Sequence, residues 1–161
     1  MLGSSSIMSR LPQRVGLAVA LWVMGQAAPL AAAPEGSDGP PALGVLVAQT
    51  FLRAVAEGDL RTAAPLCAET VDFDGSVVTG ADAVRGRLEK LRKAVPEGLV
   101  LRKIVVMRLA QARRLFGPPP SRLKIPTGGD VLVGFGRFSR GGLIVFVAPE
   151  RDRFRVVALT D

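Results

Sequence analysis

Apolar residues recur at helical spacing in three stretches between residues 43 and 95. Residues 43–57 have one apolar face, formed by Leu43, Val47, Phe51 and Val55. This spacing predicts an amphipathic helix, which Gly58 would end. Asp59 can then cap a short helix over residues 60–67. A third apolar face, within residues 81–95, predicts another helix.

The spacing then changes to the alternation that is typical of strands. Val, Phe and Thr alternate with polar residues in ETVDFDGSVVTG, which predicts two short strands around a turn at Gly75-Ser76. A longer strand is expected within residues 98–109, followed by a short helix that three prolines interrupt. The last third of the chain predicts three strands, at residues 130–139, 143–149 and 154–161. Two short turns join these strands, which favours antiparallel pairing.

The first 33 residues have the three parts of a secretory signal peptide. Two arginines precede an apolar run of about 11 residues, and small residues follow it. We expect cleavage near Ala31–Ala33 and a secreted or periplasmic protein, with a retained N-terminal anchor as the alternative. Residues 34–42 are rich in Pro, Gly and small polar residues, which predicts a flexible linker. The folded domain is therefore expected at residues 43–161.

The order of elements indicates an α+β fold, with helices packed on one face of an antiparallel sheet. Three segments also resemble the NTF2-like superfamily, the fold of SnoaL-like proteins and ketosteroid isomerases: FLRAVAEGDLRTAAPLCAETVDFDG, VTGADAVRGRLEKL and RDRFRVVALTD. The resemblance covers residues 43–161. It implies an NTF2-like (cystatin-like) cone, in which three N-terminal helices pack on a curved antiparallel sheet around a pocket. It also implies a homodimer that pairs through the open face of the sheet.

Two residue types that serve many active sites are missing. The 161 residues include no histidine, no tyrosine and a single cysteine, Cys67. Ser-His-Asp and Cys-His nucleophiles are therefore excluded, and so is a zinc site built on histidine. We expect no metal and no cofactor, and any acid–base chemistry must use Asp, Glu, Lys or Arg. The apolar surroundings of Cys67 in the sequence predict a buried structural thiol.

Asp72 and Asp74 are the candidates for a catalytic acid or base. The resemblance to ketosteroid isomerases implies a catalytic aspartate within one residue of either position. Those enzymes also use a tyrosine and a protonated aspartate to stabilise an oxyanion. The corresponding positions in this chain hold Phe51 and, on the late strand, Leu143 or Ile144. Both oxyanion donors are therefore missing, which argues against this chemistry.

Alternation offers a second interpretation of the two aspartates. If residues 71–74 are extended, Val71 and Phe73 face the core while Asp72 and Asp74 face the other side. Mutual repulsion of the two carboxylates also favours the solvent. We therefore expect both carboxylates to be exposed, with an acid at the pocket mouth as one alternative. Another alternative groups either aspartate with an arginine and Asp130, as in epoxide hydrolases of the superfamily.

The resemblance implies a pocket, and its lining would be apolar. The residues expected to line it are Val47, Phe51, Phe73, Val133, Phe135, Val145, Val147 and Val156. The same pattern is typical of a plain hydrophobic core. We therefore expect a non-catalytic module that binds a small apolar ligand, or an accessory domain. The alternative is a SnoaL-like isomerase, cyclase or hydrolase that uses Asp72 or Asp74.

Positive charge is concentrated in one segment of a chain whose net charge is +7. Residues 85–124 hold twelve Lys and Arg against two glutamates. The candidates for anion binding are Arg92, Lys93, Arg102, Lys103, Arg113 and Arg114. In an exported protein this cluster favours an anionic surface or an acidic partner as ligand. Specific nucleic-acid binding is not expected, because Phe116 is the one aromatic residue of the segment. A solvated, arginine-rich surface is the alternative.

Overall fold

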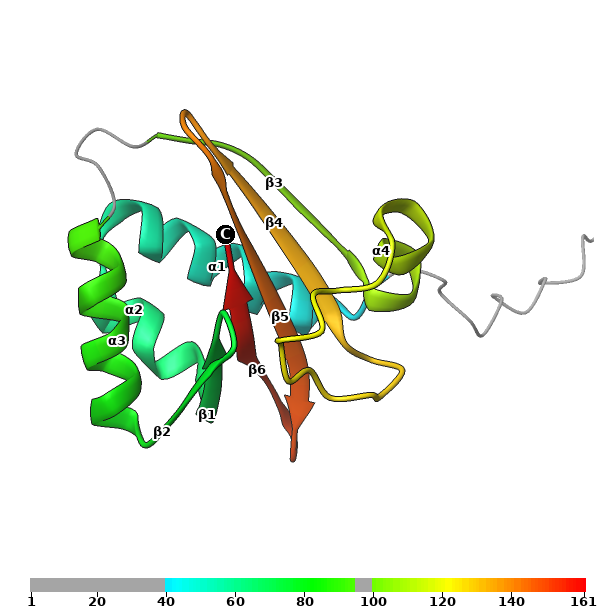
Figure 1. Cartoon of the computed structure of the whole chain (residues 1–161), viewed down its shortest axis with the longest axis horizontal. Helices are drawn as coiled ribbons and strands as arrows, with labels where there is room; N and C mark the ends of the chain where they lie inside the picture. Colours follow the sequence, from blue (N-terminus) through cyan, green and yellow to red (C-terminus); the bar gives the residue numbers. More distant parts are fainter. Residues whose placement is uncertain (1–39, 95–99) are drawn as a thin grey trace, which may run out of the picture. The chain divides into compact units, whose positions relative to one another are not determined.

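The structure, a computed structural model, describes residues 40–94 and 100–161. These residues form helices and one sheet (Figure 1). The helical elements are α1 (Ala42–Glu57), α2 (Leu60–Ala63), the 3-10 turn η1 (Ala64–Leu66), α3 (Ala81–Ala94) and α4 (Leu109–Phe116). The predicted signal peptide lies outside the described residues, and so does most of the predicted linker.

The end of α1 and the start of α2 agree with the sequence. Gly58 follows α1 with a left-handed φ of 73°, and its N–H reaches the carbonyl oxygens of the last turn. Asp59 caps α2, where its Oδ1 accepts the backbone N–H of Thr62 at 3.1 Å. Both predictions are confirmed.

The six strands form one sheet in the order β2-β1-β6-β5-β4-β3. Their bounds are β1 (Cys67–Phe73), β2 (Ser76–Thr79), β3 (Leu101–Arg108), β4 (Leu132–Phe138), β5 (Gly142–Glu150) and β6 (Arg153–Thr160). Strands β3 to β6 form an antiparallel meander, and β1 pairs with β2 antiparallel. The α+β class is confirmed. The sheet is mixed, however, because β1 and β6 pair in parallel where the hairpin meets the meander.

Helix α1 packs closely on one face of the sheet. Phe51 and Leu52 are completely buried in the core between them. Two glycines on β4 permit the close approach, since a Cβ at Gly136 would lie 2.9 Å from Leu52 Cδ2, and one at Gly134 would lie 3.2 Å from Ala48 Cβ. Side chains therefore fill this face of the sheet.

The opposite face of the sheet is covered by a later part of the same chain. Residues 109–130, called here the covering segment, consist of α4 and the loop that follows it. They form a second apolar core with the sheet, whose buried members are Met107, Leu109, Ala112, Leu123, Val131, Val133, Phe146, Ala148 and Ala158. The covering segment leaves less open sheet for the predicted homodimer, which stays a prediction.

Two boundary predictions are wrong. The second helix does not reach Cys67: α2 ends at Ala63 and η1 follows, because Pro65 has no backbone N–H to continue an α-helix. The turn between β1 and β2 consists of Asp74 and Gly75, not of Gly75 and Ser76, since Phe73 pairs with Ser76.

Candidate functional site

Asp72 is buried, so the expectation of an exposed carboxylate is wrong for this residue. Its side chain does point away from the α1 face, as alternation predicted, but the covering segment lies there. Only 2% of Asp72 is exposed. Its Oδ1 accepts the N–H of Gly75 at 2.6 Å and its Oδ2 accepts the N–H of Lys124 at 2.7 Å. Both oxygens therefore hold backbone in place, which indicates a structural role.

Asp74 is exposed, as predicted, although it belongs to the turn rather than to the strand. Its Oδ1 accepts the Thr160 hydroxyl at 2.5 Å and pairs with Nη2 of Arg122 at 2.6 Å. These partners hold the pKa of Asp74 below its ordinary value of 3.8. A general base that works near neutral pH needs a raised pKa instead, so this environment opposes the catalytic interpretation.

The eight residues predicted to line one apolar pocket are divided between the two faces of the sheet. Val133 and Phe135 belong to the core under the covering segment, whereas the other six belong to the α1 face. The single pocket is therefore corrected to two cores. On the α1 face Phe51, Val145, Val147 and Val156 are completely buried in side-chain packing. Val133 and Phe135 line a small hollow of about 170 Å³ beside α4.

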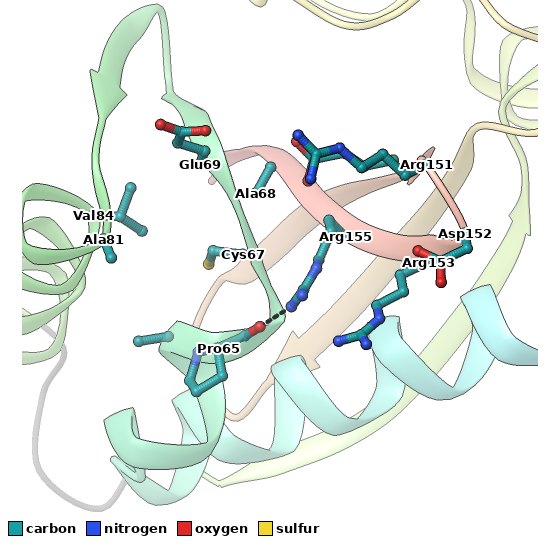
Figure 2. Close-up of a pocket in the computed structure, with 12 residues that line it drawn as sticks. Pro65, Cys67, Ala68, Glu69, Ala81, Val84, Arg151, Asp152, Arg153 and Arg155 are labelled. Carbon is teal, nitrogen blue, oxygen red and sulfur yellow. Dashed lines mark hydrogen bonds between the residues drawn. The ribbon is translucent and has the colours of Figure 1, made fainter.

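A larger hollow lies where the start of β1, the start of α3 and the β5–β6 turn meet (Figure 2). Its volume is about 620 Å³. We call it the arginine groove. Small and apolar residues line one part of it: Ala64, Pro65, Cys67, Ala68, Ala81 and Val84. The charged residues that line it are Arg151, Arg153, Arg155, Glu69, Glu150 and Asp152. The groove thus combines an apolar wall with three guanidinium groups.

Arg155 is the half-buried charge of the arginine groove. Its Nη1 donates a hydrogen bond to the carbonyl oxygen of Pro65, drawn as a dashed line in Figure 2. Among the described residues, no carboxylate lies within 4.0 Å of the guanidinium groups of Arg151, Arg153 or Arg155. The three carboxylates of the groove are on exposed residues. Arg155 is therefore a partly desolvated cation whose remaining donors have no anionic partner within the described chain.

Cys67 forms part of the apolar wall of the arginine groove. It is 9% exposed, and its Sγ lies 3.8 Å from the Ala63 carbonyl oxygen. Burial raises the pKa of the Cys67 thiol to about 12, which the charge of Arg155 lowers only in part. The thiol is therefore protonated and a poor nucleophile near neutral pH. This confirms the predicted buried thiol, although Cys67 begins a strand and does not lie in a helix.

The arginines of this groove are not among the site residues expected from the sequence. A signal was present, because Arg151, Arg153 and Arg155 alternate with other residues in RDRFR. On a strand, that spacing places Arg153 and Arg155 on the same side. In the sequence this segment contributes only to the resemblance to the NTF2-like superfamily. What the sequence could not indicate is that residues 64–84 provide the opposite wall.

The six basic residues proposed for anion binding do not form one cluster. Arg92 and Lys93 lie in the last turn of α3, and Arg102 and Lys103 lie near the start of β3. Arg113 and Arg114 lie in the last turn of α4, beyond the opposite end of β3 (Figure 1). The length of β3 separates Arg113 and Arg114 from Arg102 and Lys103. Binding of an anionic surface or an acidic partner therefore stays a prediction for each pair of residues alone.

The described residues contain neither a metal-binding cluster nor a membrane-spanning helix. Across residues 40–94 and 100–161, no three His, Cys, Asp or Glu side chains lie together as a metal site would require. None of the helices in the same ranges is long and apolar enough to span a membrane.

Comparisons with known proteins find similarity to solved structures alone. No protein-family model and no curated protein matches the chain. An NTF2-like protein of unknown function from Pseudomonas putida KT2440 is similar at 12% identity and a TM-score of 0.45, over 71% of this chain and 80% of that chain. A protein with a cystatin-like fold from Nostoc punctiforme PCC 73102 is similar at 9% identity and a TM-score of 0.47, over 75% and 91%. In fold, the chain is similar to NTF2-like and cystatin-like proteins, as the motifs predicted.

Proposed function

We propose that this chain is a non-catalytic module that binds a small ligand in the arginine groove. The observation that carries the proposal is the groove itself, an open hollow of about 620 Å³ with an apolar wall and three guanidinium groups that have no carboxylate partner among the described residues. Ligand sites of small molecules usually have volumes of about 300–1,000 Å³ and combine apolar walls with a few polar groups. The groove has this size and this composition.

The environments of the candidate catalytic residues favour binding over chemistry. Both oxygens of Asp72 accept backbone N–H groups, and Asp74 is paired with Arg122 and Thr160. Neither carboxylate lines the arginine groove. The thiol of Cys67 does line it, but its raised pKa keeps it protonated. The isomerase, cyclase or hydrolase alternative would have to use a carboxylate that already has a structural partner.

A set of small-molecule fragments, followed by backbone amide chemical shifts, tests the proposal. If the arginine groove is the binding site, amides of residues 67–69, 81–84 and 150–155 shift together and saturate with ligand concentration. Shifts confined to the hollow beside α4, or no saturable shifts with any fragment, would contradict the proposal.

A matched pair of variants on α3 locates the binding. Ala81 and Ala83 are both exposed on this helix, but only Ala81 lines the groove. Ala81→Phe should fill part of the groove and abolish the saturable shifts, because the new ring occupies ligand volume. Ala83→Phe adds the same ring outside the groove and should leave binding unchanged. Equal effects of the two substitutions would place the binding elsewhere.

A further inference from the structure

We infer that the arginine groove takes an organic monocarboxylate with a short apolar body, held by Arg155 and Arg151. This inference rests on the proposed function and adds the chemical class of the ligand. The carboxylate would take the free donors of Arg155. The apolar body would lie on the wall formed by Cys67, Ala68 and Val84.

Arg155 provides the first argument. One of its N–H groups is already used by the Pro65 carbonyl oxygen, which fixes the guanidinium at the wall of the groove (Figure 2). A half-buried guanidinium has lost part of its water, so it gains more from an anion than an exposed one does. Its planar set of donors suits a planar carboxylate. A neutral ligand would leave this charge without a partner.

Arg151 provides a second, independent argument. It has a left-handed φ of 57°, and apart from Asp74 it is the one described non-glycine residue with a positive φ. This conformation costs free energy for a residue with a Cβ, and glycine is the usual choice in a two-residue turn that requires it. In Figure 2 the Arg151 side chain extends back from the turn toward Ala68 and Glu69. A strained turn residue whose side chain lines a groove is typical of a functional constraint.

The acidic residues of the groove limit how much negative charge a ligand can carry. Glu69, Glu150 and Asp152 are exposed, so solvent screens them from the half-buried Arg155. Because three carboxylates balance the three arginines of the lining, the second charge of a dianion such as a phosphate ester gains no net attraction, whereas a monoanion needs only Arg155 and one further arginine. The combination of two suitable arginines with three peripheral carboxylates therefore favours a monoanion.

Titration of the full chain with hexanoate and with hexanamide tests the ligand class. The two probes have the same apolar body and differ in charge. We expect saturable amide shifts in the groove for hexanoate, with an affinity roughly tenfold higher than that of hexanamide. The hexanoate affinity should fall as salt is raised from about 0.05 to 0.5 M, because added ions screen the pair. Equal affinities for the two probes would overturn the inference.

Four substitutions assign the effect to the arginines. Arg155→Gln removes the charge and should weaken hexanoate binding roughly tenfold. Arg151→Gly should weaken it roughly threefold, while Arg151→Lys, which keeps a positive charge, should retain most of it. Arg140→Gln removes a charge from an exposed residue outside the groove and serves as the control. A loss with Arg140→Gln equal to that with Arg155→Gln would indicate a net-charge effect and overturn the inference.

The stability of the Arg151→Gly variant shows whether weaker hexanoate binding results from the lost side chain or from a less stable fold. This variant should unfold at a higher denaturant concentration than the parent while binding hexanoate more weakly, because glycine relieves the left-handed backbone. Unchanged or lower stability would overturn the argument from strain.

The outcomes also separate this inference from the proposed function. If neither hexanoate nor hexanamide nor any fragment shifts the groove, the proposed function fails. If hexanamide binds as well as hexanoate, or if butyl phosphate binds more tightly than hexanoate, the groove is a binding site and only the ligand class is wrong.

Discussion

Two hairpin turns of this protein have the same length and very different residues. Asp74 and Gly75 connect β1 to β2, and Arg151 and Asp152 connect β5 to β6. In the first turn both residues have a positive φ, 55° and 92°. In the second turn Arg151 alone has one, 57°. Asp-Gly is a favoured pair for a turn with two left-handed residues, whereas Arg is a poor choice for a left-handed position.

The difference between the turns concerns what their side chains do. Asp74 binds Arg122 and Thr160, and Asp72 beside it accepts two backbone N–H groups, so the first turn is joined to the covering segment. No hydrogen bond or ion pair within the described residues involves the side chain of Arg151. The first turn is thus explained by stability, and the second requires another explanation, which the arginine groove offers.

Substitution of Asp72 should have the largest effect on stability. Asp72→Ala leaves the N–H groups of Gly75 and Lys124 without their acceptor in a buried place, so the free energy of unfolding should fall by about 3 kcal/mol. Asp152→Ala, at the exposed aspartate of the other turn, should change it by less than about 0.5 kcal/mol. Denaturant unfolding measures both variants. Similar losses would show that Asp72 does not hold the covering segment.

Glycine substitutions test the first turn next. Gly75→Ala should lower the free energy of unfolding by about 1–2 kcal/mol, because φ is 92° and the new Cβ would lie 3.3 Å from Arg122 Cβ. Gly86 on α3 has no neighbour within 4 Å of a built Cβ, so Gly86→Ala should raise stability by up to about 1 kcal/mol. Thermal and denaturant unfolding of both variants would show whether the signs differ; equal signs would refute this account.

The second turn should respond in the opposite direction to the first. Arg151→Gly should raise the free energy of unfolding by about 1 kcal/mol, since glycine adopts a φ of 57° at little cost. Arg153→Gly removes an arginine two residues later, within β6, and should lower stability by about 0.5–1 kcal/mol. The same denaturant experiment compares them. Loss of stability in both variants would indicate that Arg151 is not strained.

Acid should lower the free energy of unfolding through the first turn, by less than the substitutions described above. The pKa of Asp74 is lower in the folded chain than its ordinary value of 3.8, so the unfolded chain takes up the proton first as pH falls. The stabilising contribution of Asp74 is therefore complete above pH 3.8 and disappears as pH falls through the folded pKa. Unfolding free energies measured down to about pH 2.5 should show this loss. The Asp74→Asn variant should lack it, and parallel curves would contradict the prediction.

The parts of the fold that the sequence predicted best depend on short-range chemistry. Gly58 ends α1 and Asp59 caps α2, because both effects act within a single turn of helix. The meander of β4, β5 and β6 was predicted from alternation and short turns. The parallel pairing of β1 with β6 was not predicted, since the two strands are more than 80 residues apart and no local pattern connects them.

The sequence missed the candidate site for the same reason. Its apolar wall comes from residues 64–84 and its arginines come from residues 151–155. The sequence places Val133 and Phe135 among the apolar residues of one pocket, but alternation defines two faces of a strand without saying what covers each face. The covering segment gave one of those faces a core of its own.

The amino-acid sequence by itself determined the order of the helices and strands, the α+β class and the absence of histidine and tyrosine chemistry. These properties follow from residue types and their spacing along the chain. The tertiary structure decided which side of β1 is exposed to solvent. It placed the backbone N–H of Lys124 against Asp72, 52 positions earlier in the chain, and so buried a carboxylate that alternation assigned to solvent. It also brought Arg155 to Pro65 and Cys67, because burial depends on contacts between distant segments that no local pattern specifies.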